Sequence, residues 1–361
     1  MKIFHCSRCE QLVYFENSLC VSCGASLAFL PDRFDMGALE LTQDQGWAEP
    51  KSGAAYKLCG NYTNHAVCNW AMPAAEDDPF CVSCRLNRVI PDLSLPGNRD
   101  AWAKVELAKR RTIYSLLALG LPVLPKTQDP NGGLAFEFLA DDPVSGRPVM
   151  TGHDEGVIVL NVIEADDSER EKRRNQLNEP YRTLLGHFRH EVGHYFWDRL
   201  VQGRPALMEF RRLFGDETIS YQDAMRRYYA QGAPLNWRDR FISAYATMHP
   251  WEDWAECWAH YLHMTDTLET ASACGLSLTP QRKDEPSLAT SKARRSFDEL
   301  VADWFPLTHV LNNLNRGLGL PDGYPFVLPP TAVEKLRFIH ELIGAAREST
   351  ATPDATAAAK A

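Results

Sequence analysis

Two histidines and a glutamate within residues 190–194 carry the strongest chemical signal in the sequence. In an α-helix, His190 and His194 lie one turn apart on the same face, about 6 Å along the axis, so both imidazoles can reach one metal ion. Glu191 follows the first histidine and can reach a water molecule on the open side of that ion. This HExxH pattern is typical of zinc sites in which the glutamate acts as general base while the water attacks a carbonyl carbon. The spacing therefore predicts a hydrolytic zinc site.

A catalytic zinc needs a third protein ligand, and the segment after residue 249 supplies the candidates. Asp198 lies two turns, about 12 Å, beyond the first histidine, which is too far for one ion. Glu252 follows Pro250, a residue suited to a helix start, and three tryptophans at helical spacing predict that this helix is buried. A buried carboxylate needs a cation or hydrogen-bond donors. We therefore predict Glu252 as the ligand, with Asp253 and Glu256 as alternatives.

Further side chains could support this site. Glu256, one turn after Glu252, could accept a hydrogen bond from the second ring nitrogen of a ligand histidine and so fix its tautomer. Tyr245, seven residues before Glu252, could stabilise the oxyanion of a tetrahedral intermediate. A tyrosine packed in the core is the competing interpretation. His187 could line the site, with an exposed first-turn histidine as the alternative. Three more histidines are candidates for the oxyanion role, each with a structural alternative: His249, His260 and His263.

Eight of the ten cysteines lie before residue 85, and this clustering is typical of metal binding rather than of disulfides. Cys6 and Cys9 form one C-x-x-C pair, Cys20 and Cys23 form another, and ten residues separate the two pairs. Four thiolates at this spacing can close a tetrahedral shell around zinc. Because a closed shell leaves no open coordination position, we predict a structural zinc here.

A second set of cysteines has a less regular spacing: Cys59, Cys68, Cys81 and Cys84. Eight residues separate its first two members, so His65 is an alternative ligand, and the two sets could also exchange ligands. Incidental buried cysteines are the competing interpretation. The sequence thus predicts Zn²⁺ as the cofactor, with one catalytic ion and one or two structural ions. The structural ions would fold a segment that is poor in apolar residues.

The elements expected to position these groups are mostly helices. One helix is expected at 101–119, and another, from Pro180 through Leu200, carries the two histidines. Later helices are expected near 205–214, 218–231, 237–248, 251–264, 294–316 and 331–346. Short apolar runs separated by turn residues predict an antiparallel meander with strands at 134–139, 149–151 and 157–161.

Composition divides the chain into three regions and indicates the α+β class. Residues 1–95 hold the clustered cysteines, residues 96–346 hold the helices and a small antiparallel sheet, and the polar residues 347–361 predict a disordered tail. The formal net charge of −9 argues against broad nucleic-acid binding. No apolar run is long enough for a membrane helix, and the start has no signal region. We therefore expect a cytoplasmic protein.

The HExxH pattern with a later glutamate resembles the gluzincin metallopeptidases. In that group the ligand glutamate precedes a supporting acid by four residues, as Glu252 precedes Glu256. Gluzincins of the lethal-factor type also carry a catalytic tyrosine seven residues before the ligand, which is the place of Tyr245. The resemblance implies a mainly helical, gluzincin-like metallopeptidase domain after an N-terminal zinc-ribbon region.

Most of the chain is similar to a bacterial family of zinc-binding metallopeptidases with an N-terminal zinc ribbon. The similar segments cover nearly the whole chain except the tail and include residues 6–23, 156–161, 179–194 and 249–256. This resemblance implies the fold and the metal, but it implies no substrate. In related folds an edge strand before the catalytic helix pairs with an extended peptide. We expect residues 157–161 to take that role.

Three functional hypotheses follow. The first is a zinc-dependent endo- or aminopeptidase that acts on a peptide or protein substrate. Its predicted residues are the zinc ligands His190, His194 and Glu252, the base Glu191 and the oxyanion partner Tyr245. The second is a zinc-ribbon interaction protein whose helical domain is structural and non-catalytic, and the third is a zinc hydrolase of isopeptide or other amide bonds. A protein partner could bind through the ribbon, whereas no nucleic-acid or membrane partner is expected.

Overall fold

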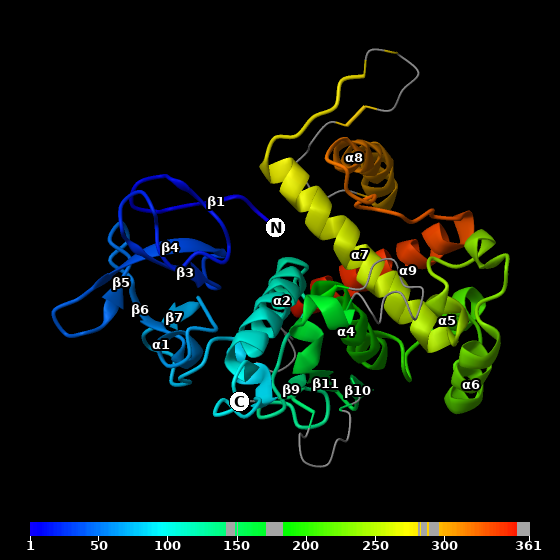
Figure 1. Cartoon of the computed structure of the whole chain (residues 1–361), viewed down its shortest axis with the longest axis horizontal. Coiled ribbons are helices and arrows are strands. Elements are labelled where there is room, and N and C mark those ends of the chain that lie inside the picture. Colours follow the sequence, from blue (N-terminus) through cyan, green and yellow to red (C-terminus); the bar gives the residue numbers. More distant parts are fainter. Residues whose placement is uncertain are drawn as a thin grey trace, which may run out of the picture. The chain divides into compact units, whose positions relative to one another are not determined.

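The computed structural model describes residues 1–141, 149, 151–170, 183–280, 282, 287–288 and 296–351. These residues pack into two compact units (Figure 1). The β-rich unit comprises residues 2–113 and 123–169, and the helical unit comprises residue 1, residues 114–122 and the described part of residues 170–361. The domain boundary expected near residue 95 stays a prediction.

Short strands build the amino-terminal half of the β-rich unit. Strands β1 (Phe4–His5) and β2 (Leu12–Val13) form a two-stranded hairpin. A five-stranded antiparallel sheet follows in simple chain order: β3 (Ser26–Leu30), β4 (Asp35–Leu41), β5 (Trp47–Ala48), β6 (Ala55–Leu58) and β7 (Ala71–Pro73). The short helix α1 (Gly60–Thr63) lies between the last two strands. The aromatic core of this half of the unit includes the buried rings of Phe29 and Trp70, whose centroids lie 4.8 Å apart.

The second sheet of this unit is mixed, so the expected antiparallel meander is wrong. Its strands are β8 (Asn87–Val89), β9 (Ala135–Leu139), β10 (Gly152–Asp154) and β11 (Val157–Asn161), in the order β10-β11-β9-β8. Strands β8 and β11 both run parallel to β9, and only β10 is antiparallel to its neighbour. Helix α2 (Asn98–Ala118) connects β8 to β9, and parallel neighbours need such a long crossover.

The position of β11 overturns the expected role of residues 157–161. This strand lies between β10 and β9 and is hydrogen-bonded to both, so it is not an edge strand. A strand paired on both sides cannot add a substrate peptide to the sheet. The strand expected at 149–151 lies partly outside the described residues, and the observed strand β10 begins at Gly152.

Helices dominate the other unit, as the sequence predicts. They are α4 (Leu184–Leu200), α5 (Ala206–Phe214), α6 (Tyr221–Gln231), α7 (Pro250–Ala273), α8 (Phe297–Gly317) and α9 (Pro330–Ala351). Ser220 and Ser296 cap α6 and α8, because each hydroxyl accepts a backbone hydrogen bond from the first turn. No helix in the part of the chain that the structure describes is long and apolar enough to cross a membrane.

Two expectations about this unit need correction. Residues 237–248 do not form one helix but hold two short 3-10 turns, at Trp237–Asp239 and Tyr245–Thr247. The carbonyl of Arg240, between these two turns, accepts a hydrogen bond from the hydroxyl of Thr331 (2.9 Å). Helix α9 continues to Ala351, so residues 347–351 are helical and the predicted tail begins too early. The remaining tail residues, 352–361, lie outside the described part.

Close packing of α4 on α7 fixes the frame of the helical unit. A Cβ atom at Gly193 would lie 3.1 Å from both the Cα atom of Ala255 and the Cβ atom of Trp258, so a larger residue would require a small shift of its neighbours. The indole N–H of Trp254 donates to the carbonyl of Gly193 (2.8 Å). Around this crossing the rings of Phe196 and Trp258 stack at 4.9 Å. The two helices are therefore held together by buried side chains before any metal is considered.

Candidate metal centre and its surroundings

Helix α4 presents the predicted histidines and the predicted base. Thr183 caps its start, because the threonine hydroxyl accepts a hydrogen bond from the N–H of Gly186 (2.9 Å). Two turns later, the rings of His190 and His194 lie 4.9 Å apart between centroids. Glu191 and His194 are buried, and His190 is partly exposed. The helix therefore keeps one edge of the histidine pair open to solvent.

Helix α7 presents the carboxylates. His249 caps its start, because its ring Nδ1 accepts a hydrogen bond from the N–H of Trp251 (3.1 Å), and Pro250 occupies the first turn. Glu252 lies in this first turn with only 2% of its surface exposed. Glu256 follows one turn later on the same face. The first turn of α7 thus delivers a buried carboxylate to the histidines of α4.

The three predicted ligands come together at this crossing. The Nε2 atom of His190 lies 2.9 Å from Oε2 of Glu252 and 3.2 Å from Nε2 of His194, and Nε2 of His194 lies 3.5 Å from Oε1 of Glu252. Tetrahedral ligands with zinc bonds of about 2.0 Å are about 3.3 Å apart. The two imidazole nitrogens and the Glu252 carboxylate, whose Oε2 lies nearer His190 and whose Oε1 lies nearer His194, therefore fit a zinc ion, and one atom from each of the three residues lies within 4.8 Å of the others.

The neighbouring acids that were alternative ligands have other partners. Glu256 accepts a hydrogen bond from Nδ1 of His190 (2.7 Å), which leaves the lone pair of Nε2 directed at the ligand cluster. Asp253 instead accepts from the ammonium of Lys335, and both side chains are buried. Asp198 is not part of the cluster. Of the three acids, Glu252 is thus the one in the candidate cluster, and its role as a ligand stays a prediction.

Electrostatics show that the cluster favours a positive charge. Burial alone would lower the pKa of His190, but the carboxylates of Glu252 and Glu256 outweigh burial and raise this pKa well above its usual range. Burial would likewise raise the pKa of Glu252, yet the two histidines hold it well below its ordinary value. Buried carboxylates of this kind need a compensating cation.

Glu191 lies on the same helix with its carboxylate ionised. Burial would raise its pKa, but the hydrogen bond with His187, whose Nε2 lies 3.1 Å from Oε1, and the neighbouring histidine charges lower it. His187 therefore lies beside Glu191 at the edge of the site, which agrees with the first of the two interpretations given for it above. A buried, ionised carboxylate next to the ligand cluster has the protonation state that a general base requires.

Two tyrosines face the cluster, and the sequence indicated only one of them. The ring of Tyr245 lies 6.0 Å from that of His190. Tyr221, at the start of α6, donates a hydrogen bond to Oε1 of Glu252 (2.8 Å). Burial, with the charge of Glu252, raises the pKa of both tyrosines, so both hydroxyls remain protonated. Tyr221 lies 31 residues before Glu252, and no spacing rule connects the two.

The remaining histidine candidates have structural roles. His249 caps α7, and its Nε2 donates to the carbonyl of Ile219 (3.1 Å). His260 donates through Nδ1 to the carbonyl of Glu256 (3.0 Å), with its ring 4.3 Å from that of Phe326. His263 packs against Trp304 at 5.6 Å. None of the three belongs to the ligand cluster within the described residues.

The cysteines gather into the two predicted clusters, Cys6, Cys9, Cys20 and Cys23, and Cys59, Cys68, Cys81 and Cys84. Sulfur–sulfur distances are 3.6 and 3.8 Å in the first cluster and 3.9 Å in the second. Tetrahedral thiolates with zinc bonds of about 2.3 Å lie about 3.8 Å apart, so both clusters fit zinc. His65 instead packs against Trp102, and the two cysteine sets are not interleaved.

The two clusters differ in exposure. All four cysteines of the second cluster are buried, whereas Cys9 of the first is exposed and Cys23 is half-buried. Backbone N–H groups also support the second cluster, because Trp70 donates to Cys68 and Cys81 donates to Cys59, each at 3.4 Å. Such bonds are typical of the tight turns around structural zinc.

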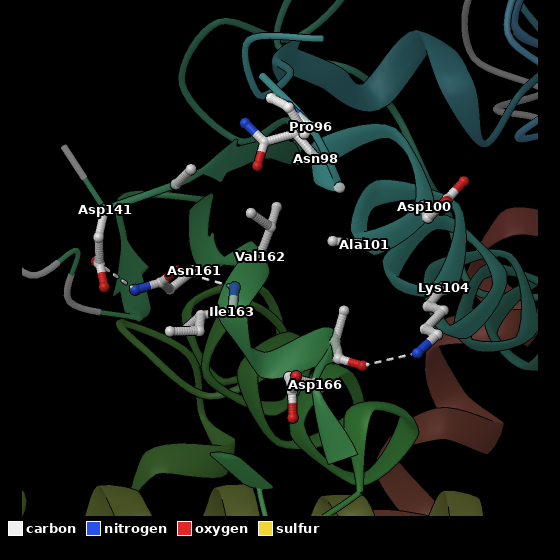
Figure 2. Close-up of a pocket in the computed structure, with 13 residues that line it drawn as sticks. Pro96, Asn98, Asp100, Ala101, Lys104, Asp141, Asn161, Val162, Ile163 and Asp166 are labelled. Atoms are coloured by element: carbon white, nitrogen blue, oxygen red, sulfur yellow. Dashed lines mark hydrogen bonds between the residues drawn. The ribbon is translucent and has the colours of Figure 1, made fainter. Parts of the chain in front are cut away.

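A hollow of about 490 Å³ lies in the β-rich unit (Figure 2). The start of α2 and the turn after β11 line it. Its polar side chains bond within the wall: Lys104 donates to the carbonyl of Ala165 (3.3 Å), and Asn161 donates to Asp141 (2.7 Å). None of the predicted site residues is among its lining residues. We assign it no part in the metal chemistry.

Comparison with known proteins identifies the family. Residues 98–342 match the family described as "Putative zinc-binding metallo-peptidase", and residues 3–95 match a zinc-ribbon domain. Two similar relatives, from Mycobacterium bovis and Mycobacterium tuberculosis, are each 43% identical over 344 residues, 95% of this chain and of the relative, and both are uncharacterized. No solved structure matches the chain. The chain therefore belongs to this zinc-binding metallo-peptidase family.

Proposed function

We propose that the protein is a zinc-dependent peptidase that hydrolyses peptide bonds with His190, His194 and Glu252 as zinc ligands and Glu191 as general base. The observation that carries this proposal is the close approach of the two histidine nitrogens and the Glu252 carboxylate, at 2.9 to 3.5 Å, beside the buried carboxylate of Glu191. A structural zinc site would be closed by a fourth protein ligand. Among the residues that the structure describes, this cluster has three, which leaves a position for water.

In this proposal each residue around the zinc has a separate role in the hydrolysis. Zinc bound at this cluster would lower the pKa of a coordinated water and polarise the scissile carbonyl. Glu191 takes one proton from the water as its oxygen attacks the carbonyl carbon, and it returns that proton to the leaving amide nitrogen as the C–N bond breaks. Glu256 holds His190 in the tautomer that keeps Nε2 unprotonated (2.7 Å to Nδ1).

Tyr245 is the proposed donor to the oxyanion. Its hydroxyl stays protonated because burial raises its pKa, and its ring lies beside His190. A donor in a buried site stabilises the charge that develops on the carbonyl oxygen only in the transition state. Replacement by phenylalanine should therefore reduce turnover and leave the metal in place.

The cysteine clusters are proposed as two structural zinc sites, which gives three zinc ions per chain. Four thiolates close each shell, so neither cluster has a position for a substrate. None of the ten cysteines forms a disulfide in the structure, and a reducing, cytoplasmic setting is part of the proposal. A protein partner for the ribbon stays a prediction.

A peptide-library experiment tests this function. We would incubate a mixed peptide library with the full chain, with the Glu191→Gln variant and with chelated protein, and identify products by mass spectrometry. We expect cleavage by the untreated wild type, at least about 100-fold less by Glu191→Gln, whose zinc content is unchanged, and none after chelation. Equal cleavage by wild type and Glu191→Gln would rule out Glu191 as the base.

A further inference from the structure

The carboxylate of Glu252 has two different environments, one for each oxygen. Its Oε2 atom faces the ligand nitrogen of His190 at 2.9 Å. Its Oε1 atom accepts a hydrogen bond from the hydroxyl of Tyr221 at 2.8 Å and lies farther, 3.5 Å, from His194. One oxygen is thus engaged by a neutral donor, and the other is directed at the histidine that Glu256 holds. The donor comes from a helix that contributes no ligand.

Tyr221 is itself fixed by contacts at the start of α6. Ser220 caps the helix, and the adjacent carbonyl of Ile219 accepts a hydrogen bond from Nε2 of His249 (3.1 Å). The Tyr221 ring packs against the ring of His249 at 5.3 Å and against that of Trp251 at 6.1 Å. These bonds attach the first turn of α6 to the first turn of α7, where Glu252 lies.

The rest of α6 is largely exposed. Ala224 is the buried residue of this helix, and Tyr229 near its end is 58% exposed. Farther along the helix, the ring of Tyr228 packs against that of Tyr245 at 5.7 Å. A helix of 11 residues that is largely exposed gains little stability from packing. The first turn of α6 is therefore the part that contacts the ligand carboxylate itself.

We propose that Tyr221 is a positioning residue that orients the zinc ligand Glu252, holding Oε1 so that Oε2 is the oxygen offered to the metal. This inference rests on the proposed function, since it takes Glu252 as a ligand. Partners that hold a metal ligand in this way typically contribute 10–100-fold in metal affinity. A phenylalanine at 221 keeps the ring against His249 and Trp251 and removes only the hydroxyl.

The two tyrosines have different proposed roles, because they contact different groups. Tyr221 acts on the ligand, so its loss should weaken metal binding. Tyr245 acts on the substrate oxyanion, so its loss should leave metal binding unchanged. The two Tyr→Phe variants remove the same chemical group and differ only in which of these properties changes.

Metal titration of the full chain tests the proposal without any substrate. Zinc would be titrated into wild type, Tyr221→Phe, Tyr245→Phe and the control Tyr229→Phe in competition with a chromophoric chelator, with the cysteine clusters kept loaded. The visible spectrum of Co²⁺ bound at the histidine site would be recorded for each protein. Circular dichroism and the zinc retained by the cysteines would verify that each variant is folded.

We expect Tyr221→Phe to weaken zinc binding at this site about 10–100-fold and to alter the Co²⁺ spectrum, while Tyr229→Phe and Tyr245→Phe match wild type. In a Glu252→Gln background the Tyr221→Phe change should have no further effect, because the two residues act together. Wild-type affinity and spectrum in folded Tyr221→Phe would overturn the inference alone. A wild-type chain that binds no metal beyond the cysteine clusters would overturn the proposed function with it.

Discussion

The two units of the protein gather their metal-binding side chains in different ways. In the β-rich unit each four-cysteine cluster comes from one short stretch of chain, residues 6–23 or 59–84. In the helical unit the ligands come from two helices, and His190 and Glu252 are 62 residues apart. A cysteine cluster can form when its own turns fold, whereas the histidine cluster requires α4 and α7 to be packed together first.

This difference predicts opposite relations between metal and folding. In the β-rich unit the strands are short, and the cysteine clusters join turns beside an apolar core that includes Phe29 and Trp70, so zinc should add to the stability of these turns. The helical unit holds α4 against α7 through the Trp254–Gly193 hydrogen bond and stacked aromatic rings. Its ligands are preorganised by the core, and the metal should add chemistry more than stability.

The largest expected effect is the loss of a cysteine ligand. Cys81→Ser opens the buried second cluster, and structural zinc of this type contributes on the order of 10 kcal/mol of metal-coupled folding free energy in zinc-finger peptides. We expect one zinc ion to be lost and residues 55–90 to exchange amide hydrogens rapidly, with slow exchange retained in α4 and α7.

Hydrogen exchange measured peptide by peptide, with zinc analysis, checks this expectation. Cys274→Ser is the matched control, because that thiol is exposed and belongs to neither cluster. Fast exchange spreading through α4 and α7 in Cys81→Ser would contradict the separation between the two kinds of site. So would unchanged exchange in residues 55–90.

A smaller loss of stability is expected when Glu49, which lies next to the first cysteine cluster, is replaced by glutamine. Its buried carboxylate accepts hydrogen bonds from Ser52, Arg33 and Ser7, and Ser7 lies between the cluster's first two cysteines. Burial would raise the pKa of Glu49, but the bonds from Ser52 and Arg33 outweigh it and lower the pKa to about 2. This corresponds to up to about 3 kcal/mol of stability.

The sign of the pH dependence follows from that depressed pKa. The stabilisation is fully present above pH 4.5 and is lost as the pH falls through about 2. Denaturation of the zinc-loaded chain should show Glu49→Gln less stable by the same amount from pH 8 to 5, with the difference shrinking below 4.5. Glu10→Gln, at an exposed ion pair with Lys51, is the control and should change little. A difference that grows on acidification would contradict this assignment.

The smallest expected effect tests whether helix packing alone preorganises the histidine site. In Gly193→Ala the new Cβ would lie 3.1 Å from the Ala255 backbone, and such overpacking costs about 1–3 kcal/mol, partly offset by about 1 kcal/mol of helix propensity. In the control Gly344→Ala the new methyl group meets open space, so we expect a gain of about 0.5–1 kcal/mol.

Thermal unfolding of both variants checks this pair. We expect the transition of the helical unit to fall in Gly193→Ala and to rise in Gly344→Ala, with peptidase activity reduced only in the former. Equal stabilisation by the two alanines would show that the contact between α4 and α7 can accommodate a methyl group. It would also show that the crossing does not fix the ligand positions tightly.

The candidate ligand groups that depend on local spacing could be predicted from the sequence. The histidine pair and the two cysteine sets lie together as their spacing indicates. Glu252 could be selected from its neighbours because a buried helix leaves a carboxylate few options, and the structure pairs the neighbouring Asp253 with Lys335 instead. In each case the information lies within a few turns of chain.

Features that depend on contacts between distant segments could not be predicted from the sequence. The hydrogen bond from Tyr221 to Glu252 depends on where α6 packs, which no local pattern encodes. Parallel pairing of β8 with β9 depends on α2 acting as a crossover, and alternation within a strand does not reveal its direction. The segment expected as a helix at 237–248 holds two 3-10 turns, and its Arg240 carbonyl bonds to Thr331 in α9, a contact that no local pattern encodes.

The zinc content of the purified full chain tests the central claim most directly. Elemental analysis would compare wild type with His194→Ala, a change that removes one histidine ligand and leaves both cysteine clusters intact. We predict about three zinc ions per chain in wild type and about two in the variant, with the fold retained. Two zinc ions in both proteins would show that the histidine cluster holds no metal, and would contradict the zinc-peptidase proposal.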